Sequence, residues 1–218
     1  MNNGGDKRKK KKMNYKEAWE RYCNVSNWRE AGQHVDWAYE IEADTIYIYL
    51  QGSDEKIDWK RDFMLKPLRW VYGLWIHKGF YAMAKELYDD NNFRNIFEQN
   101  GYLKRFVLIG HSCGGAIALL TVALAFYLYT TIEVYTFGAP CIFWLNSADS
   151  IIKESKNIRI TNVRLNRDII PKLLLPFGYR KNPGNHIVLE SPYFNPIKSH
   201  LPDSYNKAIK ALDKMECV

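Results

Sequence analysis

The most informative segment of the sequence is Phe106-Val107-Leu108-Ile109-Gly110-His111-Ser112-Cys113-Gly114-Gly115. Its first four residues form a continuous apolar run, which is typical of a strand buried on both faces. Glycine two positions before and two positions after the serine removes side chains that would collide in a tight strand-to-helix turn. Such a turn holds the serine on a strained backbone with its hydroxyl exposed, beside the free N–H groups of the next helix.

Two other interpretations of this stretch are a glycine-rich turn without chemistry and a phosphate-binding loop. A Walker loop needs a longer spacer and a Gly-Lys-Ser/Thr ending, and neither is present. A buried strand before the motif and an apolar helix after it favour a third interpretation, the nucleophile elbow of an α/β-hydrolase fold.

Strands and helices alternate outward from the elbow. An α/β-hydrolase fold is expected, with a mostly parallel central sheet, helices on both faces and an antiparallel edge from an N-terminal hairpin. The expected strands are 36–41, 45–50, 106–109, 132–137, 158–165 and 187–189. The expected helices are 15–22, 79–99, 115–129, one reaching about residue 154, and one starting at Asp203.

A serine hydroxyl needs a hydrogen-bonded base, and in this fold the acid and then the histidine follow the serine along the chain. The chain has five histidines: His34, His77, His111, His186 and His200. The first two precede the elbow, and the third flanks the serine with its side chain expected to point elsewhere. His186 opens a predicted strand, whereas His200 lies in a loop before the last helix. We therefore expect His200 to be the general base, the alternative being a surface-loop histidine.

The acid should follow a strand at the carboxyl edge of the sheet. Asp168 follows the predicted strand 158–165. Asp149 falls in a predicted helix, and Asp203 is expected to be the N-cap of the final helix. We therefore predict Asp168 as the triad acid, the alternative being a plain turn aspartate.

The chain resembles the class 3 lipase family, the fungal-lipase-like branch of the α/β-hydrolases. The resemblance covers roughly residues 40 to 210, and its motifs occur in family order. The matching segments are Ile48–Ser53, Asp58-Trp59, His77–Phe80, Gly110–Ala116, Thr136–Pro140, Asp168–Pro171 and His200 ahead of Tyr205. The resemblance implies hydrolysis of acyl esters by Ser112 as nucleophile, Asp168 as orienting acid and His200 as general base.

The resemblance also implies an oxyanion hole made by the backbone N–H of Ser53, with its hydroxyl as a second donor, and the backbone N–H of Cys113. One departure from the family pattern is Gln51, which stands where an arginine usually precedes Gly52. That arginine is a supporting residue, so the change bears on local stability more than on chemistry.

The net charge of +7 comes mostly from the unbroken basic run at residues 7–12. Without this run and Asp6, the remainder has 25 basic and 23 acidic residues, a net charge of +2. We expect residues 1–13 to be a disordered basic tail and residues 14–218 to form a single domain. The tail alone could serve as a localisation signal, a lipid anchor or a nucleic-acid arm. The near-neutral remainder argues against nucleic acid as a partner.

Lipid or other acyl esters are the expected substrates. The basic and aromatic residues at 54–69 suggest a lid that touches an anionic membrane surface, or else an ordinary amphipathic segment. No cluster has zinc-ligand spacing and a serine triad needs no cofactor, so neither metal nor cofactor is expected. Four cysteines make no disulfide framework, and no signal peptide is recognised, so a cytoplasmic location is expected. The sequence carries no indication of the oligomeric state.

Three functional alternatives remain open. The same triad would serve a small-molecule carboxylesterase or an acyltransferase. An α/β-hydrolase fold can also be a non-catalytic binding module, although such a module has no chemical reason to keep all three triad residues.

Overall fold

A computed structural model describes residues 13–52, 66–70, 73–100, 103–125, 131–145 and 155–215. Its central sheet has seven strands in the order β1-β2-β3-β6-β7-β9-β11. The strands are β1 Arg29–Ala31, β2 Val35–Glu42, β3 Thr45–Gly52, β6 Arg105–His111, β7 Thr131–Phe137, β9 Ile158–Leu165 and β11 Asn185–Leu189. Every pairing from β3 to β11 is parallel, whereas β1 and β2 add an antiparallel edge. This confirms the predicted fold class.

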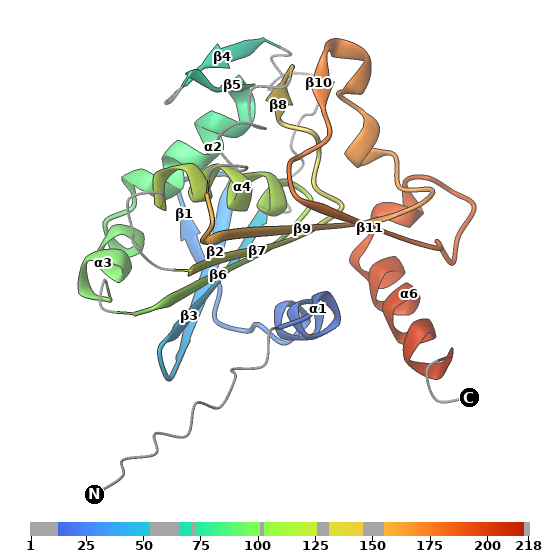
Figure 1. Cartoon of the computed structure of the whole chain (residues 1–218), viewed down its shortest axis with the longest axis horizontal. Coiled ribbons are helices and arrows are strands. Elements are labelled where there is room, and N and C mark those ends of the chain that lie inside the picture. The colour runs from blue at the N-terminus through green and yellow to red at the C-terminus, as the bar shows by residue number, and fades with distance from the viewer. Residues whose placement is uncertain are drawn as a thin grey trace, which may run out of the picture.

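Helices cover both faces of this sheet (Figure 1). On one face lie α2 Lys78–Asp89, α3 Asn91–Gln99 and α4 Cys113–Ala125. On the other face lie α1 Tyr15–Cys23 and α6 Pro202–Met215. The single helix expected over 79–99 is divided at Asp90, whose backbone is extended. The Asp90 carboxylate accepts a bond from the Asn92 N–H, 2.8 Å away, and so caps the second helix.

Helix α4 is apolar on all sides, which is typical of a helix enclosed by protein. It contacts the central strands β3, β6 and β7 on one side and α2 on the other. Its Ile117 and Leu120 are fully buried. Since α4 begins at the serine turn, this packing anchors the turn to the middle of the sheet.

A second, four-stranded antiparallel sheet lies beyond α2 and α4 (Figure 1). Its strands are β4 Pro67–Arg69, β5 Trp75–His77, β8 Phe143–Trp144 and β10 Tyr179–Arg180. The sequence did not predict this sheet, because strands of two or three residues carry no periodic pattern. The helix expected after Pro140 is wrong at 143–144, which form β8, and residues 146–154 lie outside the described residues.

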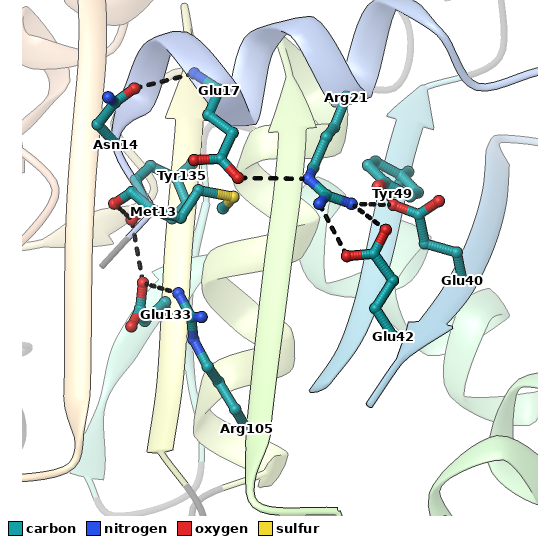
Figure 2. Close-up of polar contacts among 10 residues, drawn as sticks. All are labelled: Met13, Asn14, Glu17, Arg21, Glu40, Glu42, Tyr49, Arg105, Glu133 and Tyr135. Carbon is teal, nitrogen blue, oxygen red and sulfur yellow. Dashed lines mark hydrogen bonds and ion pairs between the residues drawn. The ribbon is translucent and has the colours of Figure 1, made fainter. Parts of the chain in front are cut away.

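Helix α1 is capped by Asn14, whose Oδ1 accepts from the Glu17 N–H at 2.9 Å. Just before it, Met13 is buried, and its carbonyl accepts a 2.6 Å bond from the Tyr135 hydroxyl (Figure 2). The described part therefore includes Met13, which the sequence assigned to the tail. Residues 1–12 of the expected tail lie outside the described residues.

An arginine ties α1 to the hairpin of β2 and β3 (Figure 2). Arg21 Nη1 lies 2.7 Å from Glu40 Oε1, and Nη2 lies 2.8 Å from Glu42 Oε2. Its guanidinium also lies 4.3 Å from the centre of the Tyr47 ring. Together these contacts hold α1 across the edge of the sheet. None of the described helices has the length and apolar character needed to span a bilayer.

Candidate active site

Ser112 lies at the turn between β6 and α4, where the sequence places it. Its φ of 53° is in the left-handed region that residues other than glycine rarely adopt. The turn leaves no space for side chains at the flanking glycines. A Cβ added to Gly110 would lie 2.4 Å from the Gly114 backbone, and one added to Gly114 would lie 1.9 Å from the Leu50 oxygen. Backbone crowding therefore sets the position of the serine.

Asp168 follows β9 and is fully buried. Its Oδ1 accepts a 2.9 Å bond from the Ile170 N–H at the start of a 3-10 helix, Ile170–Lys172. Its Oδ2 accepts a 2.6 Å bond from the Tyr205 hydroxyl, which comes from α6. These donors satisfy the carboxylate where water is excluded, so its orientation is fixed.

His200 ends a 3-10 helix, Lys198–His200, just before α6. The adjacent Ser199 is fully buried, and its hydroxyl donates to the Asn195 carbonyl at 2.8 Å. The Ser204 hydroxyl donates to the Lys198 carbonyl at 2.5 Å. Bonds on both sides of His200 therefore hold the loop that carries it.

The fold brings Ser112, His200 and Asp168 into one chain of hydrogen bonds. His200 Nε2 lies 2.7 Å from Ser112 Oγ. His200 Nδ1 lies 2.9 Å from Asp168 Oδ2 and 3.1 Å from Oδ1. Since the carboxylate accepts, Nδ1–H donates to it, and Nε2 is left to accept the serine proton. Residue pairs 88 and 32 positions apart in sequence thus meet with hydrogen-bond geometry.

Gly138 leaves space for these hydrogen-bonded side chains, a role that the sequence did not indicate. Its φ is 62°, at the end of β7. A Cβ there would lie 2.8 Å from the Tyr205 hydroxyl, 2.9 Å from Asp168 Oδ2 and 3.0 Å from His200 Cε1. Only glycine leaves the space that the side chains of Asp168 and His200 occupy.

His111 also lies closer to the site than predicted. Its Nε2–H donates to the backbone carbonyl of His200 at 2.9 Å, and the two rings stack with centroids 5.0 Å apart. Burial, and secondarily the nearby His200, lower the pKa of His111 to about 3, so its ring stays neutral. The side chain points away from Ser112, as expected, and the sequence did not predict its contact with His200. Strand alternation was the available signal, because His111 shares a face with Val107 and Ile109.

An aromatic cluster supports His111 from the α1 side. Trp19 is 2% exposed, and its ring centroid lies 5.9 Å from His111, 4.7 Å from Phe137 and 5.5 Å from Tyr205. Trp19 therefore contacts one residue bonded to the His200 backbone and another bonded to Asp168.

The predicted oxyanion donors are only partly described. Cys113 is the first residue of α4, where a backbone N–H has no partner within the helix. Burial raises the pKa of its thiol to about 11, so the side chain stays protonated at neutral pH. Ser53 lies outside the described residues.

Two other candidates from the sequence lie away from this chain of hydrogen bonds. The exposed His186 donates from Nε2 to the Asn182 carbonyl at 2.7 Å. Asp203 is not the N-cap of the last helix, which begins at Pro202; it pairs with Lys207 one turn later. The described residues contain no group of three or more His, Cys, Asp or Glu side chains that could hold a metal ion.

Several solved structures share the fold. The triacylglyceride lipase of Rhizomucor miehei is 24% identical with a TM-score of 0.61, over 74% of this chain and 66% of that chain. Lipase II of Rhizopus niveus is 20% identical with a TM-score of 0.63, over 78% and 67%. A triacylglycerol lipase described as having a serine protease triad as its catalytic centre is 25% identical with a TM-score of 0.58, over 74% and 66%. The chain spans about two thirds of the length of these lipases.

No curated protein sequence gives a significant match to the chain. The family model described as "Lipase (class 3)" matches residues 47–177, which is more than half of the chain. The matched range begins in β3 and includes both Ser112 and Asp168. The chain belongs to the class 3 lipase family of carboxylic ester hydrolases.

Proposed function

We propose that the protein hydrolyses carboxylic esters of lipids through an acyl-enzyme formed on Ser112. The observation that carries this proposal is the hydrogen-bonded chain from Ser112 Oγ through His200 to the buried Asp168, at 2.7 and 2.9 Å. A similar lipase described with a serine protease triad supports the same roles here. Membership of the lipase family supports a lipid ester as the substrate.

In the first half-reaction, Ser112 Oγ attacks the ester carbonyl while His200 Nε2 takes its proton. The tetrahedral intermediate then collapses, and the imidazolium returns that proton to the departing alcohol. In the second half-reaction, His200 activates a water that attacks the acyl-serine, and the fatty acid leaves. Asp168 holds the ring in the required tautomer and stabilises the imidazolium in both halves.

The negative charge of the intermediate needs donors placed beside the serine. We propose the N–H of Cys113, which the start of α4 leaves without a helical partner. Ser53 as a second donor rests on the family resemblance alone. Removing one such donor typically costs on the order of a hundredfold or more in rate.

Apolar side chains near the proposed triad support a lipid-facing surface. Ile169 and Leu201, each next to a triad residue in the chain, are 43% and 50% exposed. The loop before His200 exposes Phe194 (83%) and Ile197 (72%), and Arg167 lies 4.0 Å from the Phe194 ring centre. We propose that this surface makes transient contact with an anionic membrane. Most of the expected lid at 54–69 lies outside the described residues.

A small-molecule carboxylesterase or an acyltransferase would use the same hydrogen bonds, and no described contact separates these from a lipase. A non-catalytic module is disfavoured, because such a module has no need for a serine held at hydrogen-bond distance from a histidine. The described cysteines Cys23, Cys113 and Cys141 are free thiols, which supports the proposal of a reducing compartment such as the cytoplasm.

The test is active-site labelling with a fluorescent alkyl fluorophosphonate, followed by mass spectrometry of the labelled peptide. We expect labelling at Ser112 in the wild-type chain and none in Ser112→Ala. The control is Ser26→Ala, which changes an exposed serine between α1 and β1 and should label like wild type.

A chain-length series of p-nitrophenyl esters, acylglycerols and phospholipids then separates the substrate classes. Faster turnover of short water-soluble esters than of long-chain ones would favour the small-molecule esterase. A folded protein that stays unlabelled, even after detergent is added to open a lid, would exclude the proposed chemistry and favour the binding module.

A further inference from the structure

A cavity of about 180 Å³ lies on the α4 face of the sheet, at the carboxyl ends of β7, β9 and β11. Thr136, Asn162 and Val188 from these strands form one side of it. The segments around Cys141, Pro171 and Asn182 form the other sides. Since a water in the liquid takes about 30 Å³, the cavity has space for a small polyatomic ion.

Three cationic side chains line this cavity: Arg164, Lys172 and Lys181. None of the described residues that line it is Asp or Glu. Within the described part of the chain, the side chains of Arg164 and Lys181 make no hydrogen bond and no salt bridge. Lys172 Nζ donates to the Asn166 carbonyl, at 3.0 Å, and to no other described residue. Among the described residues, the cavity thus concentrates positive charge that no lining carboxylate neutralises.

Buried amides hold the wall of the cavity in place. Asn182 is 4% exposed; its Oδ1 accepts from the Ile142 N–H at 3.2 Å and its Nδ2 donates to the Pro140 carbonyl at 2.9 Å. Asn162 is 7% exposed; its Oδ1 accepts from the Thr136 hydroxyl and its Nδ2 donates to the Pro183 carbonyl, both at 2.9 Å. The cavity is therefore supported by satisfied hydrogen bonds and not by side chains free to collapse into it.

The thiol of Cys141 brings no competing negative charge. Its Sγ donates to the Pro171 carbonyl at 2.9 Å. Burial raises the pKa of this thiol to about 11, although Lys181 and Arg164 act in the opposite direction. The electrostatic influence of both cations thus reaches the cavity wall, and the thiol remains neutral at physiological pH.

We propose that this cavity is an anion site that binds a phosphate group, with Arg164 and Lys181 as its principal ligands. The planar Arg164 guanidinium suits two phosphate oxygens at once, and Lys181 supplies a compact second charge. A phosphate with up to two negative charges matches three cations better than a singly charged carboxylate does.

Two backbone segments that line the cavity also contact or carry residues of the proposed triad. Ala139 lines the cavity, whereas the preceding Gly138 lies against Asp168 and His200. Likewise Pro171 lines the cavity, whereas Asp168 begins the same loop and accepts the Ile170 N–H. A phosphate bound here would contact the backbone segments that position the acid.

The test is isothermal titration of inorganic phosphate into the full Ser112→Ala chain, with chloride of equal ionic strength as the reference. We expect saturable binding with a dissociation constant of about 1 mM. Adding Arg164→Gln and Lys181→Gln should raise that constant at least about tenfold, because charge-assisted hydrogen bonds are lost. The matched control adds Arg94→Gln in α3 and Lys104→Gln just before β6, which also remove two charges and should leave the constant unchanged.

Lys181→Gln alone is a second variant, since this exposed residue can be changed without disturbing the core. It should weaken phosphate binding severalfold. Absence of saturable binding, or equal binding by the pocket and control variants, would overturn the proposal. Because the titration uses a chain without the serine nucleophile, its outcome is independent of the proposed esterase activity.

The phosphate could come from a phospholipid headgroup or from free phosphate. Enzyme kinetics of variants that retain Ser112 distinguish these two sources. If the source is a phospholipid headgroup, the pocket substitutions should raise KM for monomeric dihexanoyl phosphatidylglycerol and leave KM for dihexanoylglycerol unchanged. If the source is free phosphate, neither KM should change while phosphate binding is lost. Either pattern supports the site and identifies its ligand.

Discussion

The two faces of the central sheet hold the proposed triad in different ways. On the α4 face the core is mainly aliphatic, and Ser112 is positioned by backbone crowding among Gly110, Gly114 and Leu50. On the α1 and α6 face the core is aromatic and polar, and His200 and Asp168 are positioned by bonds from His111 and Tyr205. The position of the proposed nucleophile therefore depends on excluded volume, whereas the positions of the proposed acid and base depend on directed hydrogen bonds.

This difference predicts that substitutions on the two faces have different effects on the protein. A change in volume beside the serine should disrupt the fold, since β3, β6 and α4 meet there. A change in hydrogen bonding on the opposite face should leave the fold intact and alter the rate or the pH dependence.

The largest effect is expected for Gly114→Ala. Its Cβ would lie 1.9 Å from the Leu50 oxygen, which belongs to the backbone of a central strand and cannot rotate away. We expect a loss of more than about 4 kcal/mol in the free energy of unfolding, or no soluble protein. Chemical denaturation measures the loss. Ala118→Gly in the same helix is the control and should cost only about 1–2 kcal/mol. A Gly114→Ala protein as stable as wild type would contradict the crowding argument.

Gly138→Ala tests the opposite face, at the residue that lies against both Asp168 and His200. The new methyl would push on Asp168 Oδ2 and His200 Cε1, both about 3 Å away. We expect kcat/KM for a soluble ester to fall on the order of 100-fold, since small displacements of catalytic groups have effects of that size. The backbone φ of 62° adds a stability cost of about 1–3 kcal/mol. Full activity in a folded variant would show that the triad tolerates this displacement.

Tyr205→Phe removes one hydrogen bond and almost no volume. Asp168 keeps its bonds from His200 and from the Ile170 N–H, so we expect kcat/KM to fall about tenfold with KM little changed. Tyr193→Phe is the control, because that hydroxyl bonds to the exposed Asp203. Equal kinetics for the two variants would mean that Tyr205 only fills space.

His111→Gln tests the pH dependence of this face. Burial lowers the pKa of His111 to about 3, below its ordinary 6.5, so the unfolded chain binds this proton more tightly. Stability from this group is complete above pH 6.5 and declines as the pH falls toward 3, by about 1.4 kcal/mol per pH unit. His77, whose pKa burial lowers to about 4, acts in the same direction. Between pH 6.5 and 4.5, the free energy of unfolding measured by denaturation should change less steeply with pH for His111→Gln than for wild type. Tyr205→Phe should keep the wild-type pH dependence. Parallel curves for His111→Gln and wild type would contradict the burial argument.

The smallest effect is expected for Arg21→Gln, in the ion-pair cluster that ties α1 to the hairpin (Figure 2). The charges are partly exposed, so we expect the free energy of unfolding to fall by about 1 kcal/mol, less at high salt. Lys85→Gln, which breaks a more exposed pair with Asp89, should cost less. A loss above about 3 kcal/mol would mean that this cluster, and not the Trp19 packing, holds α1.

Local pattern was sufficient for most of the central sheet. Apolar runs and alternation located β3, β6, β7 and β9 because each is long enough to show its period. The small second sheet was missed, because its strands are two or three residues long and pair only through tertiary contacts. The division of the predicted helix 79–99 at Asp90 was also missed, because the chain passes from one helix directly to the next.

The sequence alone predicts Ser112, Asp168 and His200 as nucleophile, acid and base, because the elbow glycines and the order of the elements leave few alternatives. The residues that surround these three side chains are brought to them by tertiary packing. Gly138, Tyr205 and His111 contact the proposed triad residues, and Trp19 packs against Tyr205 and His111. These four residues come from separate elements, so their contacts exist only in the folded chain. The same is true of the cationic cavity, since Arg164 and Lys181 belong to different segments that meet only in the fold. Spacing along a chain encodes local conformation, whereas distance between segments is set by how their buried faces pack.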